Sequence, residues 1–521
     1  MVKVLLTSVF KPFGLDNKLN SRRILPELFE GQITFAQGIF SLRSVLYTWG
    51  LDLIASNIQA PTTVMHYPSL KEFVKELKKG YDYVGINFVV ATFDKAKIMA
   101  KKIREISPET KIIFGGYGTI LPEADKIADY VCREEGITFM RRLLNEPEES
   151  NKIKFPIKLT RTNIMGFPTS LSIVFPLSLG CPNGCDFCCT SHFYKRKRIP
   201  FVKDGKTFYE ELVRIEKKTG VIDFGIIDED FLLQKKFLTE FSKYNSKRKK
   251  PFVFSCFGSA KSISMYTPDE LIRSGITTIW IGVESKNAHF DKLKNMDVSE
   301  MMLSLQKVGI NILGSFIVGL FHHNEKTLKA DFENFMSLRP TLSQFIISTP
   351  HIGTPLYERL KNEGRIFKNI PNKNADGFSL IFKHPNFTPE RLSEIQMALY
   401  KEDYGRLGPS AFRYIETQFN GYKNLKNSPD PSIRVRAKFY KESCRSVYPL
   451  IPAGIRYAPN RKIRKWVRDL SRELYSEFGN PNILERLFSM IVSLKAYYCW
   501  QRRNKKLPVN PKLIITRYRV S

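Results

Sequence analysis

Four of the eight cysteines in the chain lie within nine residues, in the stretch CPNGCDFCC, at Cys181, Cys185, Cys188 and Cys189. The first three follow a CxxxCxxC spacing. The glycines and the proline of this stretch favour tight turns, so one short loop can wrap several thiolates around a single centre. Because thiolates are ligands for zinc and for the iron of iron–sulfur clusters, the spacing predicts a metal centre in this loop.

Three kinds of centre are compatible with these residues. A zinc site needs four ligands in a tetrahedron, and either Cys189 or His192 could supply the fourth. A disulfide pair fits poorly with the reducing compartment that the scattered spacing of the other cysteines favours. An iron–sulfur cluster is normally held by four thiolates, so three in one loop imply a cluster with one iron open to a substrate or cofactor.

The loop follows a predicted strand at 171–178, which is the first of six. The other five are predicted at 221–227, 252–257, 277–283, 311–319 and 342–349. Helical patterns lie between them, for example at 206–220, 269–275 and 325–338. Six such units are too few for a closed eight-stranded barrel and fit an open, partial (β/α)6 barrel of the TIM type. Chemistry in barrels takes place at the carboxyl ends of the strands, which is where the cysteine loop lies.

The residues before the barrel also alternate strands with helices. Strands are predicted at 3–10, 81–90 and 110–116, helices at 69–80 and 94–108, and a short strand followed by a helix at 128–144. This order predicts a Rossmann-like domain with a parallel sheet. Residues 145–168 are polar and charged and are predicted to form a linker.

After the barrel the pattern becomes mainly helical, for example at 389–407. We therefore expect an α/β fold in three parts: a Rossmann-like domain (1–150), a partial barrel (168–370) and a helical, basic C-terminal region (371–521). The apolar run at the N-terminus is expected to be a first strand rather than a signal peptide, and no transmembrane helix is predicted.

The cysteine loop resembles the signature of radical S-adenosylmethionine (SAM) enzymes, with Phe187 as the aromatic residue of CPNGCDFC. Further segments resemble this superfamily in order and spacing: IIDEDFL, SGITTIWIGVES, GSFIVGL and STPHIGTPLYERL. The resemblance covers about residues 170–370 and, more weakly, the N-terminal domain. It implies that Cys181, Cys185 and Cys188 hold a [4Fe–4S] cluster that reductively cleaves SAM to a 5′-deoxyadenosyl radical. It also implies a low-potential electron donor such as ferredoxin or flavodoxin.

The resemblance also implies SAM contacts outside the cysteine loop. Phe187 is expected near the adenine, Asp228 and Glu284 near the amino or ribose groups, and Gly314 where the adenosyl group approaches the fifth strand. The family often carries Gly-Gly-Glu at the second strand, whereas this chain has Asp228-Glu-Asp-Phe. His322, His323 and His351 lie after the fifth and sixth strands and are candidates for substrate contacts.

The N-terminal domain is similar to the cobalamin-binding domain of hopanoid methylases and of the Mg-protoporphyrin ester cyclase group. The Gly115-Gly116 pair would suit the close approach of a nucleotide-like tail. The Asp-x-His-x-x-Gly loop that supplies a cobalt ligand is missing, because no histidine precedes His66. Two readings stay open: cobalamin bound without a protein ligand, or a degenerate domain kept as a lid or scaffold.

The chain is strongly basic, with a net charge of +31. Residues 421–521 hold 23 Lys and Arg against 6 Asp and Glu, which is a net +17. This asymmetry indicates an anionic partner, either nucleic acid or an anionic membrane; a solvated basic face is the alternative. Residues 482–506 combine an apolar body, aromatic residues and a basic end, which is typical either of a helix lying in a membrane interface or of one packed on the barrel. RNA is the weaker candidate, since no RNA-binding module or TRAM-like barrel is recognisable.

Together these features predict a cytoplasmic radical SAM enzyme, peripheral on the inner face of the membrane in one reading, that acts on a small, apolar or lipid-like molecule. Bound cobalamin would make the reaction a methyl transfer. Without cobalamin, hydrogen abstraction followed by C–C coupling or rearrangement is expected. A hypothesis of another class is a non-catalytic, zinc-binding RNA or membrane adaptor.

Overall fold

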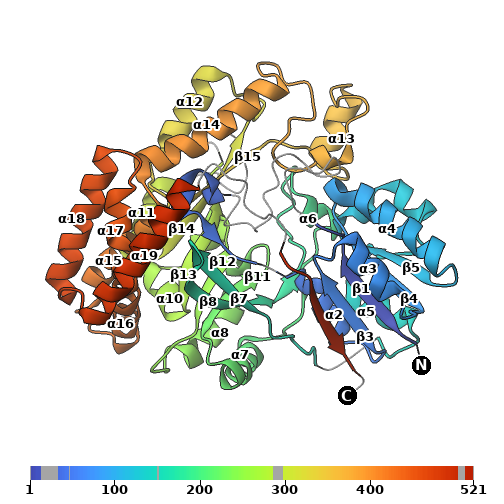
Figure 1. Cartoon of the computed structure of the whole chain (residues 1–521), viewed down its shortest axis with the longest axis horizontal. Coiled ribbons are helices and arrows are strands. Elements are labelled where there is room, and N and C mark those ends of the chain that lie inside the picture. Colours follow the sequence, from blue (N-terminus) through green and yellow to red (C-terminus); the bar gives the residue numbers. More distant parts are fainter. Residues whose placement is uncertain are drawn as a thin grey trace.

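The protein was analysed as a computed structural model, which describes residues 2–12, 33–45, 47–148, 152–284, 297–502 and 511–519. Ser285 of the SGITTIWIGVES segment and residues 503–506 of the basic end lie outside these ranges. Two large sheets, a two-stranded pair of β9 (Ser178–Leu179) with β10 (Ile199–Pro200) and a group of C-terminal helices make up the architecture of the described residues (Figure 1). The expected α/β fold, with a parallel-sheet domain, a partial barrel and a helical region, is confirmed.

The N-terminal sheet has the strand order β16-β3-β1-β4-β5-β6. Its strands are β1 (Val4–Ser8), β3 (Thr62–His66), β4 (Tyr83–Asn87), β5 (Lys111–Gly115), β6 (Tyr130–Val131) and β16 (Ile514–Tyr518). All pairings are parallel except that of β16 with β3. The helices of this domain are α2 (Trp49–Ala55), α3 (Leu70–Leu77), α4 (Phe93–Ile106) and α5 (Gly136–Leu143). Without β16 this is the flavodoxin-like strand order, whose ligand-binding switch point lies at the carboxyl ends of β1 and β4.

The second sheet is an open half-barrel with the order β15-β14-β13-β12-β11-β8-β7-β2. Six of its strands run parallel: β8 (Phe167–Pro176), β11 (Asp223–Ile227), β12 (Val253–Phe257), β13 (Ile276–Gly282), β14 (Asn311–Val318) and β15 (Leu342–Ile347). These are the six strands that the sequence predicts. Helices that connect them are α7 (Gly205–Thr219), α8 (Lys235–Asn245), α10 (Pro268–Arg273), α11 (Val298–Lys307) and α12 (Glu325–Ser337). The parallel direction puts the carboxyl ends of all six strands on one rim.

The predicted linker is wrong over its second half. Residues Leu159–Ile164 form strand β7, which pairs antiparallel with β8 and with the short strand β2 (Leu42–Arg43). Thr160, Thr162 and Ile164 are buried while the residues between them are more exposed, so the polar composition hides a half-buried strand. Met165 and Gly166 both have positive φ, which is the backbone of a tight hairpin turn. The half-barrel therefore gains two strands beyond the predicted six.

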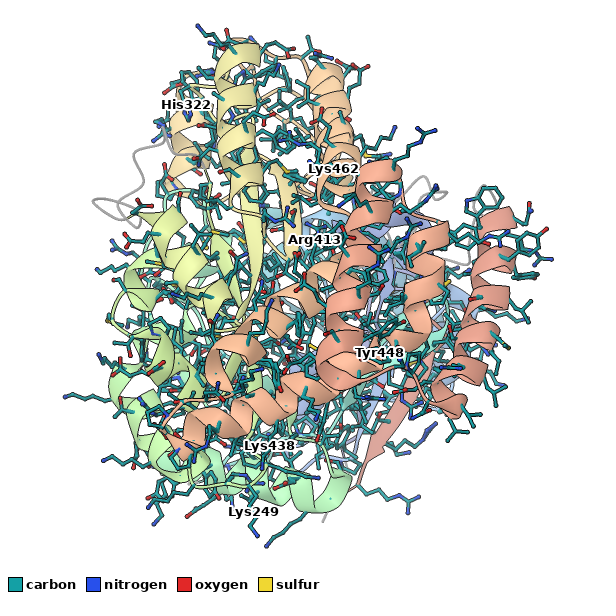
Figure 2. The ribbon with its side chains drawn as sticks, turned by 90° about the vertical axis from the view of Figure 1, so that its left-hand side faces the viewer. Lys249, His322, Arg413, Lys438, Tyr448 and Lys462 are labelled. Carbon is teal, nitrogen blue, oxygen red and sulfur yellow. The ribbon has the colours of Figure 1, made fainter. Side chains whose placement is uncertain are left out.

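The C-terminal region contains the helices α14 (Pro389–Leu407), α15 (Ser410–Leu425), α16 (Pro431–Ser446), α17 (Ile451–Arg456), α18 (Arg461–Phe478) and α19 (Ile483–Gln501). Figure 2 shows Lys438 and Lys462, which are exposed, on the outer side of these helices. No helix within the described residues is long and apolar enough to cross a membrane. The prediction of a purely helical region misses β16, which returns to the N-terminal sheet.

A buried carboxylate ties this returning strand to the N-terminal domain. Asp52 of α2 is fully buried and accepts hydrogen bonds from His66 at 2.7 Å and from the Tyr518 hydroxyl at 2.7 Å, while the Lys158 ammonium lies 2.9 Å away. Burial opposes ionisation of Asp52, but these partners outweigh it and lower the pKa of its carboxyl. Asp52 thus joins α2, β3, the segment before β7 and the C-terminal strand.

We expect Tyr518→Phe to lower the free energy of unfolding by about 1.5 kcal/mol, because it removes a hydrogen bond to a buried carboxylate. Thermal unfolding followed by circular dichroism should show a melting temperature a few degrees lower. Tyr130→Phe, at the opposite edge of the same sheet, is the matched control and should leave it unchanged. Equal melting temperatures for the two variants would contradict the role given to Tyr518.

Candidate active site

The three cysteines of the CxxxCxxC motif lie on one loop at the carboxyl rim of the half-barrel. The loop joins the short strand β9 (Ser178–Leu179), which follows β8, to helix α6 (Cys189–Phe193). Gly180 has φ +72°, and a side chain there would place a Cβ 2.2 Å from the carbonyl oxygen of Lys197. A Cβ at Gly184 would lie 2.3 Å from the Arg196 guanidinium. The two glycines therefore let the loop turn back tightly on α6.

Ser191 holds the loop in shape. Its hydroxyl donates to the Cys181 carbonyl at 2.7 Å and accepts from the Gly184 amide at 3.0 Å. Nε2 of His192 lies 3.1 Å from the Cys185 carbonyl oxygen, so this nitrogen carries a proton and donates. His192 therefore supports the backbone of the loop through the nitrogen that a zinc ligand would most readily use.

The structure bears on two of the three kinds of centre. No disulfide joins any of the eight cysteines, all of which lie within the described residues, so the disulfide interpretation is not supported. Tetrahedral zinc would bring its sulfur ligands to within about 3.8 Å of one another, whereas each thiolate of an iron–sulfur cluster binds a different iron. Among the described residues, the group of three potential ligands whose atoms all lie within 4.8 Å of one another is His322, His323 and Asp331.

The Cys181 thiol is the most buried of the three. Burial, with the nearby Asp230 carboxylate and the other two thiols, raises its pKa to about 12. Without a metal this thiol is therefore protonated at neutral pH. Metal ligation requires the thiolate, so binding of a cluster would release protons from the loop.

Asp228, one of the expected SAM contacts, is occupied by protein groups. It follows β11, is 2% exposed, and accepts from the Ser178 hydroxyl at 2.7 Å and from Nε of Arg198 at 2.9 Å. Its second oxygen accepts from the Asp230 amide at 3.1 Å. These bonds link β11 to the strand before the cysteine loop, so Asp228 acts as a structural brace.

Asp230 braces the same loop from the other side. One of its oxygens accepts from the Asn183 side-chain amide at 2.8 Å, inside the cysteine loop. The other oxygen accepts from the Ser262 hydroxyl at 2.5 Å and from the Ser259 amide at 3.2 Å. The two buried carboxylates at the end of β11 thereby fix the position of the cysteine loop on the rim.

Glu229 lies between these two braces. Its side chain reaches solvent, yet protein surrounds it closely enough that burial, with the Asp228 charge, raises its pKa. It also influences the Cys189 thiol and interacts with the Thr190 side chain. Glu229 is therefore the exposed acidic side chain of this segment, next to the start of α6 and the end of the cysteine loop.

Glu284 and Gly314 have different surroundings from one another. Glu284 lies two residues after β13, has a positive φ of 56° and is 5% exposed, and its amide donates to the Ser315 carbonyl at 3.1 Å. Such a backbone is strained for a non-glycine residue.

Gly314, the other predicted contact, lies in β14. A Cβ at Gly314 would lie 2.9 Å from the Phe335 ring of α12, so the missing side chain serves helix packing outside the barrel. The expectation that it admits the adenosyl group is not supported.

A cavity of about 670 Å³ opens beside the cysteine loop. Phe187 lines it, together with the carboxyl ends of β14 and β15 and with helix α13 (Pro355–Asn362). Its walls are mostly apolar, and its polar residues include His322, His351, Arg359 and Arg365. The volume and lining are typical of a site for a small molecule with an apolar body.

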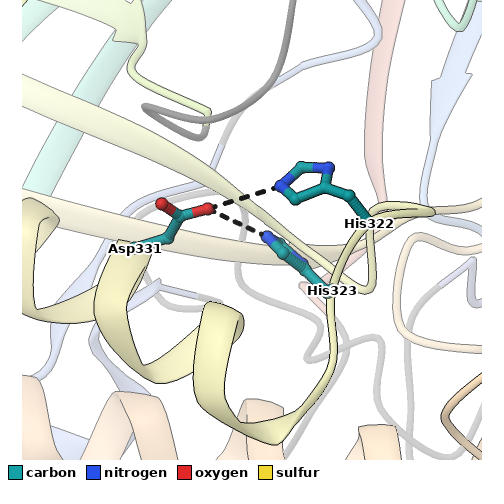
Figure 3. Close-up of side chains that lie close together, drawn as sticks. All are labelled: His322, His323 and Asp331. Carbon is teal, nitrogen blue, oxygen red and sulfur yellow. Dashed lines mark hydrogen bonds and ion pairs between the residues drawn. The ribbon is translucent and has the colours of Figure 1, made fainter.

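The two adjacent histidines after β14 have different roles. Nδ1 of the buried His323 accepts from the amides of Gly319 and Leu320 at 3.1 and 3.0 Å, so its Nε2 carries the proton and donates to Asp331 at 3.2 Å (Figure 3). This tautomer has no free nitrogen for a metal or a substrate. His322, which lies 3.5 Å from the same carboxylate, lines the cavity with His351. Of the three predicted histidine contacts, His322 and His351 therefore reach the cavity and His323 does not.

The carboxyl edge of the N-terminal sheet faces the rim of the half-barrel. Tyr117, just after β5, contacts the rings of Phe193 in α6 and of His351, with centroid distances of 5.6 and 6.2 Å. The Tyr117 hydroxyl also donates to the carbonyl of Ile352. A group held at the edge of the N-terminal sheet would therefore lie close to the cysteine loop and the cavity.

The N-terminal edge offers space but no cobalt ligand within the described residues. His66 is fully buried and is bonded to Asp52 and to the Thr48 amide. A Cβ at Gly116 would lie 2.6 Å from the Phe88 carbonyl oxygen, so this glycine serves the packing of β5 on β4. At Gly115, by contrast, no atom lies within 4 Å of the position that a Cβ would take, and Val89 is 48% exposed. Within the described residues, this edge therefore has room beside Gly115 and no available histidine ligand.

Comparisons with known proteins agree with this geometry. No family model matches the chain. It is 22% identical over 406 residues to an uncharacterized methyltransferase of Pyrococcus horikoshii, covering 68% of this chain and 87% of that protein. It is 29% identical over 241 residues to the bacteriochlorophyllide d C-12(1)-methyltransferase of Chlorobaculum tepidum, covering 43% of this chain and 50% of that one.

The fold is also that of a solved structure. The radical SAM methyltransferase TsrM of Kitasatospora setae, with tryptophan substrate and a SAM analogue bound, aligns over 85% of this chain and all of its own with a TM-score of 0.56 and 12% identity. The sequence relatives, this fold and the three cysteines on the rim agree with one another. The chain is therefore similar in sequence to methyltransferases and similar in fold to a radical SAM methyltransferase.

Proposed function

We propose that this enzyme transfers a methyl group to a carbon of a small, largely apolar molecule, with a [4Fe–4S] cluster, SAM and cobalamin as cofactors. One observation carries the proposal: the cysteine loop, the cavity and the carboxyl edge of the N-terminal sheet meet in one place. The names of the relatives, which are methyltransferases, agree with this reaction.

Cys181, Cys185 and Cys188 would hold the cluster, which when bound supplies the low-potential electron that cleaves SAM. Ser191 and the braces Asp228 and Asp230 keep the loop in the shape that the cluster needs. Glu229 is proposed to bind the positively charged amino group of SAM, because its exposed carboxylate lies next to the end of the cysteine loop, by Cys189 and Thr190. Phe187, on the wall of the cavity, is proposed to contact the adenine, and Glu284 stays a candidate for the ribose.

The cavity favours a substrate with an apolar body, since apolar side chains from β14, β15 and α13 form most of its wall. Its two arginines pair with acidic residues that also line it, Arg359 with Asp186 at 3.5 Å and Arg365 with Glu363 at 3.4 Å, so its edge carries charges of both signs. Burial lowers the pKa of His351, so this residue is neutral at physiological pH and can donate or accept a hydrogen bond. A lipid-like molecule fits these walls. A ferredoxin or flavodoxin is the proposed electron donor.

The packing of aromatic rings below the carboxyl edge of the N-terminal sheet favours a second reaction. A Cβ at Gly118 would lie 2.2 Å from the Phe88 ring, which also packs on Phe93 and Phe114. This packing fills the space under the switch point. If the edge therefore holds no cobalamin, the enzyme would abstract a hydrogen atom and couple or rearrange its substrate.

The adjacent residues Cys188 and Cys189 provide a matched test of the cluster ligands. We expect Cys188→Ala, purified and reconstituted without oxygen, to lose most of the roughly four irons per chain. It should also lose at least about 99% of 5′-deoxyadenosine formation with SAM and dithionite. Cys189→Ala removes a thiol outside the motif and should keep the iron and most of the activity.

Iron content, visible absorption and 5′-deoxyadenosine are the readouts. Equal iron in both variants would contradict the assignment of the ligands. One tightly bound zinc ion in place of iron in the wild-type chain would overturn the enzymatic proposal and favour the zinc-binding adaptor.

The neighbouring carboxylates Asp228 and Glu229 separate structural from cofactor contacts. We expect Glu229→Gln to raise the KM for SAM about tenfold or more with little change in stability, since it removes the charge of an exposed side chain. Asp228→Asn should instead lower the free energy of unfolding by about 2 kcal/mol, because Arg198 loses a buried partner. The reverse pattern in SAM titrations and thermal unfolding would assign the cofactor contact to Asp228.

Cobalamin binding decides between the two proposed reactions. The chain should retain cobalamin after incubation and gel filtration, and methylated product should form only in its presence. Because His66 is held by Asp52 and Thr48, the electron paramagnetic resonance spectrum of bound cob(II)alamin should lack coupling to a histidine nitrogen. An active chain that binds no cobalamin would refute methyl transfer and favour coupling or rearrangement.

A further inference from the structure

Helix α19 turns its large apolar residues away from the protein. Ile483, Leu484 and Leu494 are 77%, 76% and 72% exposed. The other exposed apolar residues of the helix are Leu487, Phe488, Met490, Ile491, Tyr497, Tyr498 and Trp500. We name the surface that these ten residues form the α19 face. Monomeric proteins rarely leave so many neighbouring apolar side chains in water, so the α19 face is a binding surface.

The opposite side of α19 packs on the protein through small side chains. Val492 and Ala496 are buried, and Ser489, Ser493 and Cys499 are partly buried on the same side. The helix lies against η8 (Tyr448–Leu450) and α17, and Arg445 anchors its first turn through Glu485 at 2.9 Å. The helix is thus fixed in place by its less apolar side.

Basic residues border the α19 face on both sides. Arg486 and Lys495 are nine residues apart, which at about 100° per residue puts them on opposite sides of the helix, one at each edge of the apolar face. Both side chains are exposed. Residues 482–506 contain six Lys and Arg against one Asp or Glu. This arrangement of an apolar face between basic edges is typical of helices that lie in the plane of an anionic membrane.

The C-terminal end of α19 carries aromatic residues next to the basic end. Tyr497, Tyr498 and Trp500 are exposed, and the Arg502 guanidinium lies 4.2 Å from the centre of the Tyr498 ring. Tyrosine and tryptophan are enriched at the level of lipid headgroups, where one end of the ring is apolar and the other wet. The aromatic and basic residues therefore match the chemistry of a bilayer surface.

Charge decides between a membrane and a second copy of the chain. Pairing of two α19 faces would bring the basic edges of both copies together, in a protein with a net charge of +31. An anionic bilayer instead offers negative headgroups to those edges and hydrocarbon to the apolar residues. We propose that the α19 face binds the surface of an anionic membrane and holds the enzyme there as a peripheral protein.

Co-sedimentation of the full chain with vesicles tests this directly and needs no enzymatic activity. We expect binding when a quarter of the phosphatidylcholine is replaced by phosphatidylglycerol, and at least about tenfold weaker binding to phosphatidylcholine alone. Raising the salt from about 0.1 M to about 1 M should weaken the binding, because it screens the basic edges.

Leu494→Asp and Leu303→Asp form a matched pair of variants. Both replace an exposed leucine of a helix by the same charge, and Leu303, on α11, is 58% exposed and lies outside the α19 face. We expect Leu494→Asp to weaken binding to the anionic vesicles about tenfold or more and Leu303→Asp to leave it within about twofold. The melting temperature of each variant should equal that of the wild-type chain, because both substituted side chains are exposed.

Three outcomes would overturn the proposal. One is equal vesicle binding by the two variants, and another is wild-type chain that stays in the supernatant with anionic vesicles. The third is a wild-type chain that light scattering shows to be a dimer and that Leu494→Asp converts to a monomer, with neither form bound by vesicles. That result would assign the α19 face to a second copy of the chain. Because no readout uses SAM, these outcomes are independent of the proposed reaction.

Discussion

The direction of the strands is the constraint on which the candidate site depends. Six parallel strands of the half-barrel end on one rim, so the cysteine loop after β8, the carboxylates after β11 and the cavity at β14 and β15 come together although they span about 200 residues. The N-terminal sheet obeys the same rule, and its carboxyl edge is turned to that rim through Tyr117. A site between two such edges can receive cofactors from both sides.

Buried polar groups then fix what the strand direction brings together. Asp228 and Asp230 hold two sides of the cysteine loop, while Ser191 closes the loop on itself. Each of these groups is buried, so a lost partner leaves an unsatisfied group at a cost of about 1–3 kcal/mol. This cost holds the backbone of the loop that carries the three thiols in one position on the rim.

Much of this architecture could be predicted from the sequence, because alternating strands and helices have distinct periods and the cysteine spacing is specific. The misses have physical causes. β7 is polar on one face and resembles a linker, and β16 pairs with a strand about 450 residues earlier, which no local pattern reveals. The sequence also does not reveal which of Asp228 and Glu229 is buried, because a shift of one residue at a strand end reverses which side chain faces inward. The pattern of α19 predicts a helix, but not that its apolar side faces outward.

The exchange of edge strands has a consequence for the evolution and engineering of this chain. β2 comes from the first 50 residues yet extends the half-barrel, while β16 comes from the last ten and closes an edge of the N-terminal sheet. An N-terminal fragment expressed alone would present β3 as a bare edge and be prone to aggregate. The two units therefore cannot be exchanged between relatives as independent modules, and recombination that keeps the fold must carry both ends of the chain together.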